Sequence, residues 1–350
     1  MNIAVLVSGG VDSSVVLRLL EQHGHTVTAF YLKIWLEDEL SYLGTCPWQE
    51  DLEYAQALCS KLEVPLEVVS FQKEYWQEVV TYTINEVKAG RTPNPDILCN
   101  QRVKFGAFYN KIGSEFEKVA TGHYARVEEQ DGLFYLHTAP DPIKDQTYFL
   151  SHLTQAQLCR ALFPIGHLTK PQVREYAERY NLPTKARKDS QGICFLGKLK
   201  FSEFIRHHLG DMPGLLIEHE TGKVLGEHKG FWYYTIGQRQ GIGLSGGPWY
   251  VVAKKPEENT VFISRNYYSS EKDRNRLIIE NCNWITGAPN AEDNLKVKLR
   301  HGPEMVPVKL ESQPGDKFLL KLGAQDQGIA PGQFAVLYRN TECLGGGVII

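Results

Sequence analysis

The first residues whose types and spacing could bind a ligand are two glycines flanked by serines. Residues 8–14 read Ser-Gly-Gly-Val-Asp-Ser-Ser and follow an apolar run at residues 3–7. Adjacent glycines let the backbone approach a ligand closely, and the N–H groups at a helix start attract an anion. The pattern therefore predicts a strand, a phosphate-binding turn and a helix, with Asp12 as the cap of that helix.

Two well-known phosphate loops are excluded here. No Gly-Lys-Ser/Thr follows the glycines, so the loop is not that of NTPases that transfer the γ-phosphate. The G-x-G-x-x-G spacing of a dinucleotide site is missing too. An ordinary Gly-Gly turn is the alternative interpretation, but the full string at the first strand of an α/β pattern favours a phosphate site.

Cysteines and an acidic residue form a second group of candidate reactive side chains. The seven cysteines are scattered and include no C-x-x-C pair, so neither a disulfide scaffold nor a zinc ribbon is predicted, and no metal ligand is assigned. Two prolines in residues 91–100 fix φ and remove donors, which predicts a stiff, irregular loop. We expect this loop to hold Asn94, Asp96 and Cys99 in one place.

Another cysteine, Cys194, is surrounded in sequence by basic residues. Cationic neighbours lower the pKa of a thiol and favour the reactive thiolate, although such a run is also typical of a solvated surface. The basic residues near Cys194 are Lys185, Arg187, Lys188, Lys198 and Lys200.

The elements that must position these residues follow an α/β pattern. Apolar strands are predicted at residues 26–32 and 66–69, with amphipathic helices between them, so we expect a parallel sheet covered on both faces. Ligands bind at the carboxyl ends of such strands, so Leu32 is placed to contact a ligand, although a plain buried leucine is at least as consistent with the sequence. Asp131 and Gly132 predict a hairpin turn.

After about Gly210 the pattern changes to short strands separated by turns rich in glycine and proline, including an expected strand at residues 232–235. We expect an α/β domain at residues 1–209, a central β-rich domain at residues 210–275 and a β-barrel at residues 276–350.

The overall composition is that of an ordinary globular protein. The 350 residues are 42% hydrophobic and carry a formal net charge of −3, so composition does not indicate a nucleic-acid partner. No apolar run approaches the ~20 residues of a membrane span, and Met1 leads directly into the first strand. We expect no signal peptide, no membrane association and a cytoplasmic location.

Motifs along nearly the whole chain resemble one enzyme family. The string S-G-G-x-D-S resembles the pyrophosphatase loop of the N-type ATP pyrophosphatases, whose domain is adenine nucleotide alpha hydrolase-like. Six further motifs are similar to those of the tRNA-specific 2-thiouridylases: residues 90–105, 121–126, 144–150, 190–195, 234–239 and 330–333. The resemblance implies an ATP-dependent, AMP-forming enzyme that replaces the 2-oxygen of the wobble uridine of tRNA with sulfur.

The resemblance also implies residue roles. ATP, with Mg²⁺ on its phosphates, is expected at Leu6, Val7, Ser8, Gly9, Gly10, Val11, Asp12, Ser13, Leu32 and Gly122. The target base and the tRNA are expected at Asn94, Pro95, Asp96, His123, Lys144, Asp145, Gln146, Arg300, His301 and Gln333. Arg239 and the basic residues near Cys194, among them Arg187, are candidate contacts to RNA phosphates. Many relatives have methionine at position 32 and an aromatic residue at position 301, so this chain departs from the family there.

In the implied chemistry, ATP adenylates the C2 oxygen and pyrophosphate departs. Cys194 carries a persulfide sulfur, Cys99 forms a disulfide with it, and Asp96 accepts a proton. The sulfur comes from a persulfide-carrying donor protein or a cysteine desulfurase. Two alternatives are an AMP-forming ligase of a small metabolite, which needs no cysteine pair, and a non-enzymatic adenine-nucleotide or RNA-binding protein.

Overall fold

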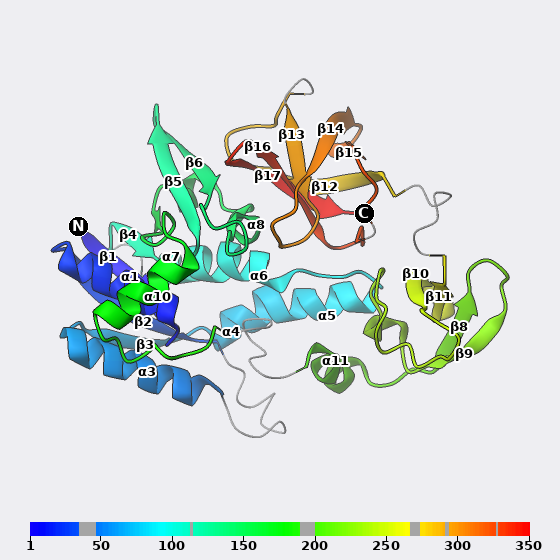
Figure 1. Ribbon diagram of the computed structural model, residues 1–350, viewed down its shortest axis with the longest axis horizontal. Helices are drawn as coiled ribbons and strands as arrows, with labels where there is room; N and C mark the ends of the chain where they lie inside the picture. Colours follow the sequence, from blue (N-terminus) through cyan, green and yellow to red (C-terminus); the bar gives the residue numbers. More distant parts are fainter. Residues whose placement is uncertain (35–46, 113–114, 190–199, 267–273, 291–293, 327) are drawn as a thin grey trace.

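The chain forms three regions around one parallel sheet (Figure 1). The computed structural model describes residues 1–34, 47–112, 115–189, 200–266, 274–290, 294–326 and 328–350. Cys194, Lys198 and the motif at residues 190–195 therefore lie outside the described residues. Among the described helices, none combines the length and apolar character needed to cross a membrane.

The N-terminal sheet is parallel throughout, as predicted. Its strands in spatial order are β3 (Leu66–Ser70), β2 (Thr26–Lys33), β1 (Asn2–Leu6), β4 (Lys118–Ala120) and β7 (Ala161–Leu162). Alternate residues of β1 point to opposite faces, so Ile3 and Val5 join one buried cluster and Ala4 and Leu6 join another. The sheet is therefore covered on both faces.

Helices on the two faces complete these clusters. One face carries α1 (Val11–Gln22), α3 (Pro47–Leu62) and α10 (Lys170–Arg179). The elements that pack toward the other face or extend from it are α4 (Gln72–Tyr75), π-helix η2 (Trp76–Val80), α5 (Thr81–Lys88), α6 (Pro95–Leu98), π-helix η3 (Cys99–Ala107), α7 (Phe108–Ile112), α8 (Thr147–Leu150) and α9 (Gln155–Leu158). This is the α/β arrangement that the strand and helix pattern predicts.

The expectation that residues 91–100 are irregular is wrong in part. Helix α6 begins at Pro95, and π-helix η3 begins at Cys99. A proline at the first helical position removes no needed hydrogen bond, and its φ already suits a helix. Pro95 thus starts a helix, and the irregular stretch ends at Asn94.

The central region is a small four-stranded sheet. Helix α11 (Phe201–Leu209) precedes it, and its order is β10 (Tyr250–Lys255), β11 (Thr260–Ser264), β8 (Gly214–Glu218) and β9 (Val224–His228), with a short helix η6 (Pro256–Glu258). The strand expected at residues 232–235 is wrong: a 3-10 helix, η5, spans Phe231–Tyr233. Phe231 enters the small core, and Trp232 packs both against that core and against the large cluster that includes α11, so two consecutive side chains are covered and strand alternation does not hold.

The C-terminal region is a six-stranded antiparallel barrel that closes by pairing of β12 with β17. Its strands are β12 (Arg276–Trp284), β15 (Lys317–Leu322), β14 (Val306–Gln313), β13 (Leu295–Lys298), β16 (Phe334–Arg339) and β17 (Glu342–Ile349). The predicted hairpin is also present, with β5 (Ala125–Gln130) and β6 (Leu133–Thr138) joined through Asp131 and Gly132, both at positive φ.

This hairpin belongs to the N-terminal region in sequence but extends the barrel sheet. Strand β6 pairs with β17, with His137 opposite Glu342 and Leu136 opposite Cys343. The barrel is therefore joined to the N-terminal region by main-chain hydrogen bonds as well as by side chains. In Figure 1 the hairpin stands between the parallel sheet and the barrel.

Candidate active site

A cavity of about 380 Å³ opens at the carboxyl ends of β1, β2 and β4. Nine of the ten predicted ATP-binding residues line it: Leu6, Val7, Ser8, Gly10, Val11, Asp12, Ser13, Leu32 and Gly122. The apolar side chains Ile34 and Trp48 also line the cavity. A strand, a tight turn and a helix thus form one wall, as the serine and glycine pattern predicts.

The tenth residue, Gly9, shapes the turn behind that wall. Its φ is +70°, and a Cβ there would lie 2.2 Å from the carbonyl oxygen of Asp51 on α3. Gly122 faces the turn from β4, where a Cβ would lie 3.0 Å from the Ser13 nitrogen. Glycine at these two positions therefore lets three segments of backbone meet around the helix start.

Asp12 does not cap helix α1, contrary to the prediction. Gly10 is the N-cap and no side chain caps the helix. The Asp12 carboxylate instead accepts hydrogen bonds from Lys170 Nζ at 2.7 and 2.9 Å and from the Tyr124 hydroxyl at 2.8 Å. Donors from two distant segments thus engage the Asp12 carboxylate, in place of the first-turn amides of α1.

Asp189 gathers the basic side chains on one side of the cavity. Lys144 Nζ lies 2.6 Å, Lys170 Nζ 2.8 Å and Arg174 Nη2 2.5 Å from its carboxylate oxygens. Burial alone would raise the pKa of Asp189, but the hydrogen bonds and charges of Lys144 and Lys170 outweigh it and hold the pKa below its usual value. Asp189 therefore stays ionised and organises the cations. The sequence did not point to Lys170 and Arg174 as site residues, because no sequence pattern connects α10 with the distant turn at residues 8–14.

Arg187 also contacts the turn itself. Its guanidinium donates to the Gly9 carbonyl at 2.7 Å, forms an ion pair with Asp51 and lies 4.6 Å from the centre of the Tyr54 ring. Arg187 was expected among the RNA-phosphate contacts, whereas the structure places it behind the nucleotide turn. Lys188 is exposed and lines the cavity.

The buried side chain of His123 lines the cavity. Its Nδ1 lies 2.7 Å from the Thr121 hydroxyl. Burial, and then the nearby charge of Lys104, lowers its pKa well below the usual value. The imidazole is therefore neutral near pH 7 and suits a neutral partner rather than a phosphate.

The loop with Asn94, Pro95 and Asp96 is held by the barrel. Gln333 Nε2 donates to the Thr92 carbonyl at 2.9 Å and to the Pro93 carbonyl at 3.3 Å. The Thr92 N–H donates to the Pro331 carbonyl at 2.7 Å. Gln333 was predicted to contact tRNA, and in this structure its amide binds the loop.

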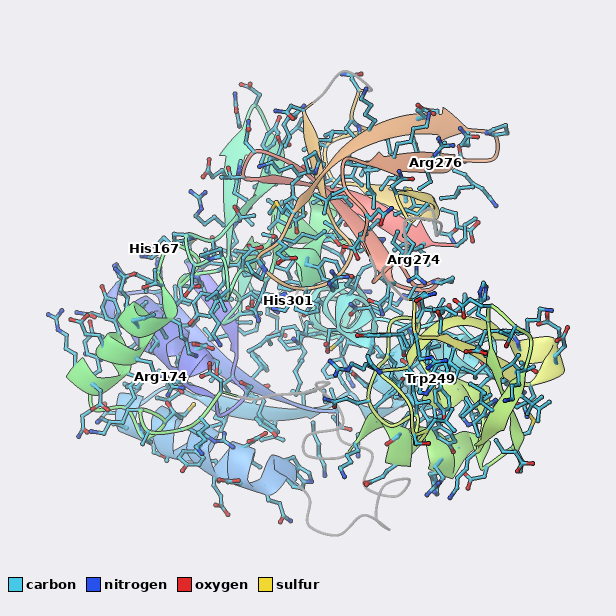
Figure 2. The ribbon with its side chains drawn as sticks, turned by 45° about the vertical axis from the view of Figure 1, so that its right-hand side comes forward. His167, Arg174, Trp249, Arg274, Arg276 and His301 are labelled. Atoms are coloured by element: carbon cyan, nitrogen blue, oxygen red, sulfur yellow. The ribbon has the colours of Figure 1, made fainter. Side chains whose placement is uncertain are left out.

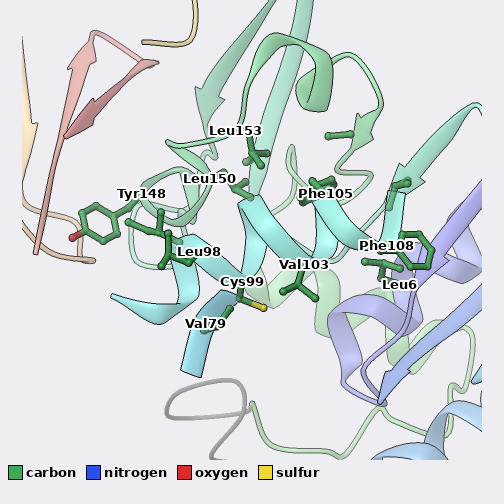
Figure 3. Packing of buried hydrophobic residues seen from close by; sticks show 14 of the residues in the cluster. Leu6, Val79, Leu98, Cys99, Val103, Phe105, Phe108, Tyr148, Leu150 and Leu153 are labelled. Carbon is green, nitrogen blue, oxygen red and sulfur yellow. The ribbon is translucent and has the colours of Figure 1, made fainter. Parts of the chain in front are cut away.

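Cys99 joins this loop to the nucleotide cavity. It begins η3, is 1% exposed and lines the cavity together with the turn residues. Figure 3 shows it close to Val79, on the helix that also carries Val103 and Phe105. One of the two predicted thiols is thus beside the proposed nucleotide site, while Cys194 lies outside the described residues.

Residues 144–146 face two directions. Lys144 and Gln146 line the cavity, and Gln146 Oε1 accepts the Tyr124 N–H at 3.0 Å. Asp145 is 1% exposed and pairs with the buried Lys298 of β13, with Nζ 2.7 Å from Oδ2. The Asp145 carboxylate is therefore buried and turned to Lys298 of the barrel.

The remaining predicted RNA contacts lie at the end of β13. Arg300 and His301 are exposed, and Arg300 forms an ion pair with Asp326 at 2.8 Å. The His301 ring lies 4.7 Å from that of Phe149 with a 33° tilt. Figure 2 shows His301 where the barrel meets the N-terminal region. These side chains form a polar and aromatic rim beside Phe149 of α8.

Comparison with known proteins agrees with this architecture. Three family models match in order: "tRNA methyl transferase HUP domain" at residues 1–198, "tRNA methyl transferase PRC-barrel domain" at residues 202–265 and "Aminomethyltransferase beta-barrel domain" at residues 274–349. Among solved structures, the chain is similar to the U34-tRNA thiolase NcsA of Methanococcus maripaludis. That similarity has 18% identity, covers 59% of this chain and 63% of the other, and its TM-score of 0.35 is too low to support an inference.

Curated relatives match over the full length. The tRNA-specific 2-thiouridylase MnmA of Parabacteroides distasonis is 47% identical, with 100% of this chain and 99% of the relative covered. The tRNA-specific 2-thiouridylase MnmA 1 of Bacteroides thetaiotaomicron is 46% identical, with the same coverage of both chains. Identity of this extent across all three regions, together with the turn and thiol at one cavity, means that the chain belongs to the family of tRNA-specific 2-thiouridylases.

Proposed function

We propose that this enzyme uses ATP to adenylate the C2 oxygen of the wobble uridine of tRNA and then replaces that oxygen with sulfur. One observation carries the proposal: Cys99 lines the same cavity as the Ser8–Ser13 turn. A uracil oxygen is a poor leaving group, and transfer of AMP to it makes a good one. A nucleotide turn and a thiol at one cavity suit both halves of this reaction.

Different walls of the cavity suit different parts of ATP. Leu32, Ile34 and Trp48 supply the apolar side that suits adenine. The turn amides, with the hydroxyls of Ser8 and Ser13, suit the pyrophosphate that departs. Lys144 and Lys188 line the same cavity and can neutralise developing phosphate charge.

Mg²⁺ is expected to enter with ATP, where it neutralises phosphate charge. The carboxylates beside the cavity are already paired, Asp12 with Lys170, Asp189 with Lys144 and Asp51 with Arg187. The described residues contain no group of three or more His, Cys, Asp or Glu side chains that could hold a metal. Mg²⁺ usually binds one or two carboxylates together with substrate phosphates, so the chain would add few ligands of its own.

Sulfur arrives on Cys194 as a persulfide from a donor protein or a cysteine desulfurase. The terminal sulfur attacks C2 directly, or leaves as hydrosulfide that attacks, and AMP departs from C2. Cys99 thiolate bonds to the Cys194 sulfur, so a disulfide forms as the S–S bond of the persulfide breaks. A thiol reductant restores both cysteines. Asp96, half-buried in the first turn of α6, is the proposed proton acceptor.

The tRNA would approach from the barrel side. Asn94 and Pro95 are proposed to meet the target base, which must leave its stack to reach the cavity. His123, Lys144, Gln146, Arg300 and His301 are the proposed further contacts. Asp145 and Gln333 are proposed to act from behind this surface. We also propose domain limits at residues 1–209, 210–275 and 276–350 and a cytoplasmic location.

Single-turnover thiolation of an unmodified tRNA transcript tests the sulfur relay. With ATP and a persulfide donor, Cys99→Ser and Cys194→Ser should each lose thiolation while adenylation of the tRNA continues. Cys159→Ser is the matched control, since this half-buried thiol does not line the cavity and its Sγ donates to the Ala156 carbonyl. Normal thiolation by Cys194→Ser would refute the relay.

An AMP-forming ligase of a small metabolite is the alternative. It would release pyrophosphate from ATP without tRNA. Pyrophosphate release that requires tRNA, measured with the intact chain, excludes this alternative and also a protein that binds ATP without consuming it.

A further inference from the structure

Lys298, a buried lysine of the barrel, contacts a segment that lines the nucleotide cavity. Lys298 is 2% exposed although it lies on the outer face of β13, since its neighbours Val297 and Leu299 fill the barrel interior. Alternation in a barrel strand would place this lysine in water. Here its ammonium is buried instead, 2.7 Å from Asp145 Oδ2 and 5.3 Å from the centre of the Tyr338 ring on β16.

The Asp145 carboxylate is fully engaged around this contact. Oδ1 accepts the Ala139 N–H at 3.1 Å, and the Thr147 hydroxyl lies 3.0 and 2.9 Å from the two oxygens. Thr147 Oγ1 also lies 3.2 Å from the hydroxyl of Tyr338 on β16. The segment is thus fixed to two barrel strands by a network whose members are all buried.

A buried ion pair of this kind is a poor general stabiliser. Removing two charges from water costs free energy that their attraction often only offsets, and apolar replacements can be equally stable. An ion pair is, however, far more demanding in geometry than an apolar contact. It therefore suits a place where the register between two segments has to be held.

Both neighbours of Asp145 reach the nucleotide cavity. Lys144 lines it and binds Asp189, which also binds Lys170, the partner of Asp12 in the opening turn. Gln146 lines it and pairs with the main chain of Tyr124 in both directions, at 2.9 and 3.0 Å. A shift of Asp145 would therefore move two cavity side chains together.

The other end of the connection is the proposed RNA rim. Arg300 lies two residues after Lys298, and His301 stacks on Phe149, whose N–H donates to the Gln146 carbonyl at 3.0 Å. RNA bound at this rim would contact residues that follow β13 and would lie beside the segment of Asp145 that Lys298 holds.

We propose that Lys298 is a positioning residue that, through Asp145, holds Lys144 and Gln146 at the cavity and links RNA binding at the barrel to nucleotide binding. The inference rests on the proposed function, since it assigns ATP and tRNA to the two ends. By linkage, bound tRNA then tightens nucleotide binding, and bound nucleotide tightens tRNA binding by the same factor.

The test measures the dissociation constant of α,β-methylene-ATP for the full-length chain, with and without a saturating unmodified tRNA transcript. We expect tRNA to lower this constant in the wild type by about 5-fold or more, a usual size for such coupling. In Lys298→Met the ratio should fall below about 2. Leu320→Ala is the control: it removes barrel core, lowers the melting temperature and should keep the wild-type ratio.

A second variant guards against misfolding, because Lys298→Met leaves a buried carboxylate without its cation. Lys298→Met combined with Asp145→Asn removes both charges and should fold, yet it should still lack the coupling. A wild-type ratio in either variant would overturn the inference, as would a wild type that binds both ligands independently. A wild type that fails to bind the nucleotide or the tRNA would instead refute the proposed function.

Discussion

The nucleotide turn lines the cavity directly, whereas the Asn94 loop connects to the cavity through α6 and Cys99, and the two are held in different ways. Residues 8–14 are shaped by their own glycines and by the strand and helix on either side of them. The Asn94 loop is shaped by Gln333 and Pro331, about 240 residues away in sequence. The first site is a local motif with distant support, whereas the second exists only when the barrel is docked. Substitutions that disturb one and spare the other can test this difference.

The largest effect is expected from Gly9→Ala. A Cβ would lie 2.2 Å from the Asp51 carbonyl oxygen, and φ is +70°, so the turn has to move. We expect α,β-methylene-ATP to bind at least about 100-fold more weakly, or about 3 kcal/mol. Gly24→Ala is the control, with φ +75° but open space around it, and should cost only about 1 kcal/mol of stability. Equal loss of nucleotide affinity in both variants would contradict the prediction.

Gly332→Ala should affect the Asn94 loop instead. The new Cβ would lie 2.8 Å from Arg91 Cβ and 2.9 Å from the Thr92 nitrogen, at φ +89°. We expect kcat/KM for tRNA thiolation to fall by about 30-fold, or about 2 kcal/mol, with nucleotide affinity nearly unchanged. Gly315→Ala, at φ +75° in open space on the barrel, controls for strain. A matching loss of nucleotide affinity would mean that the two sites are not separately held.

Gln333→Glu distinguishes loop positioning from RNA contact. Glutamate keeps the shape but loses the N–H donor to the Thr92 and Pro93 carbonyls, which costs about 1–2 kcal/mol. We expect kcat for thiolation to fall by about 10-fold while the dissociation constant of tRNA changes little. Gln313→Glu, at the exposed end of β14, adds the same charge elsewhere on the barrel and should have no effect. Weaker tRNA binding with an unchanged kcat would assign Gln333 to the RNA surface.

The smallest effect at neutral pH concerns His152, which packs against Phe334 where the barrel meets the N-terminal region. Burial lowers its pKa from 6.5 to about 4. As the pH falls, His152 is therefore protonated in the unfolded chain before it is protonated in the folded chain. Its contribution to the free energy of unfolding is complete above pH 6.5 and is lost as the pH falls toward 4. Between pH 7.5 and pH 5 this protonation lowers the free energy of unfolding by about 2 kcal/mol.

His152→Gln should remove that part of the pH dependence, which urea unfolding at pH 7.5 and 5 would measure. An unchanged difference between the two pH values would show that His152 is not a source of acid lability. Nucleotide affinity at pH 7.5 should be the same in both proteins, because His152 contacts the barrel side.

Local chemistry predicted much of the N-terminal half. The apolar run, the two glycines and the serines specify a strand, a turn and a helix because each property acts within a few residues. The parallel sheet, the hairpin at Asp131 and the cavity at the strand ends follow in the same way. The sequence misled at Pro95, where a proline starts a helix, and at residues 232–235, where aromatic residues form a 3-10 turn.

The sequence by itself determined the nucleotide turn, the α/β order of the first region and the change to short strands after residue 210. Only the tertiary structure decided that Asp12 binds Lys170, that Gln333 holds the Asn94 loop and that Lys298 is buried against Asp145. Backbone preferences and alternation depend on near neighbours and can be read along the chain. The partner of a charge depends on which distant segment covers it, and that is set by the packing of whole domains.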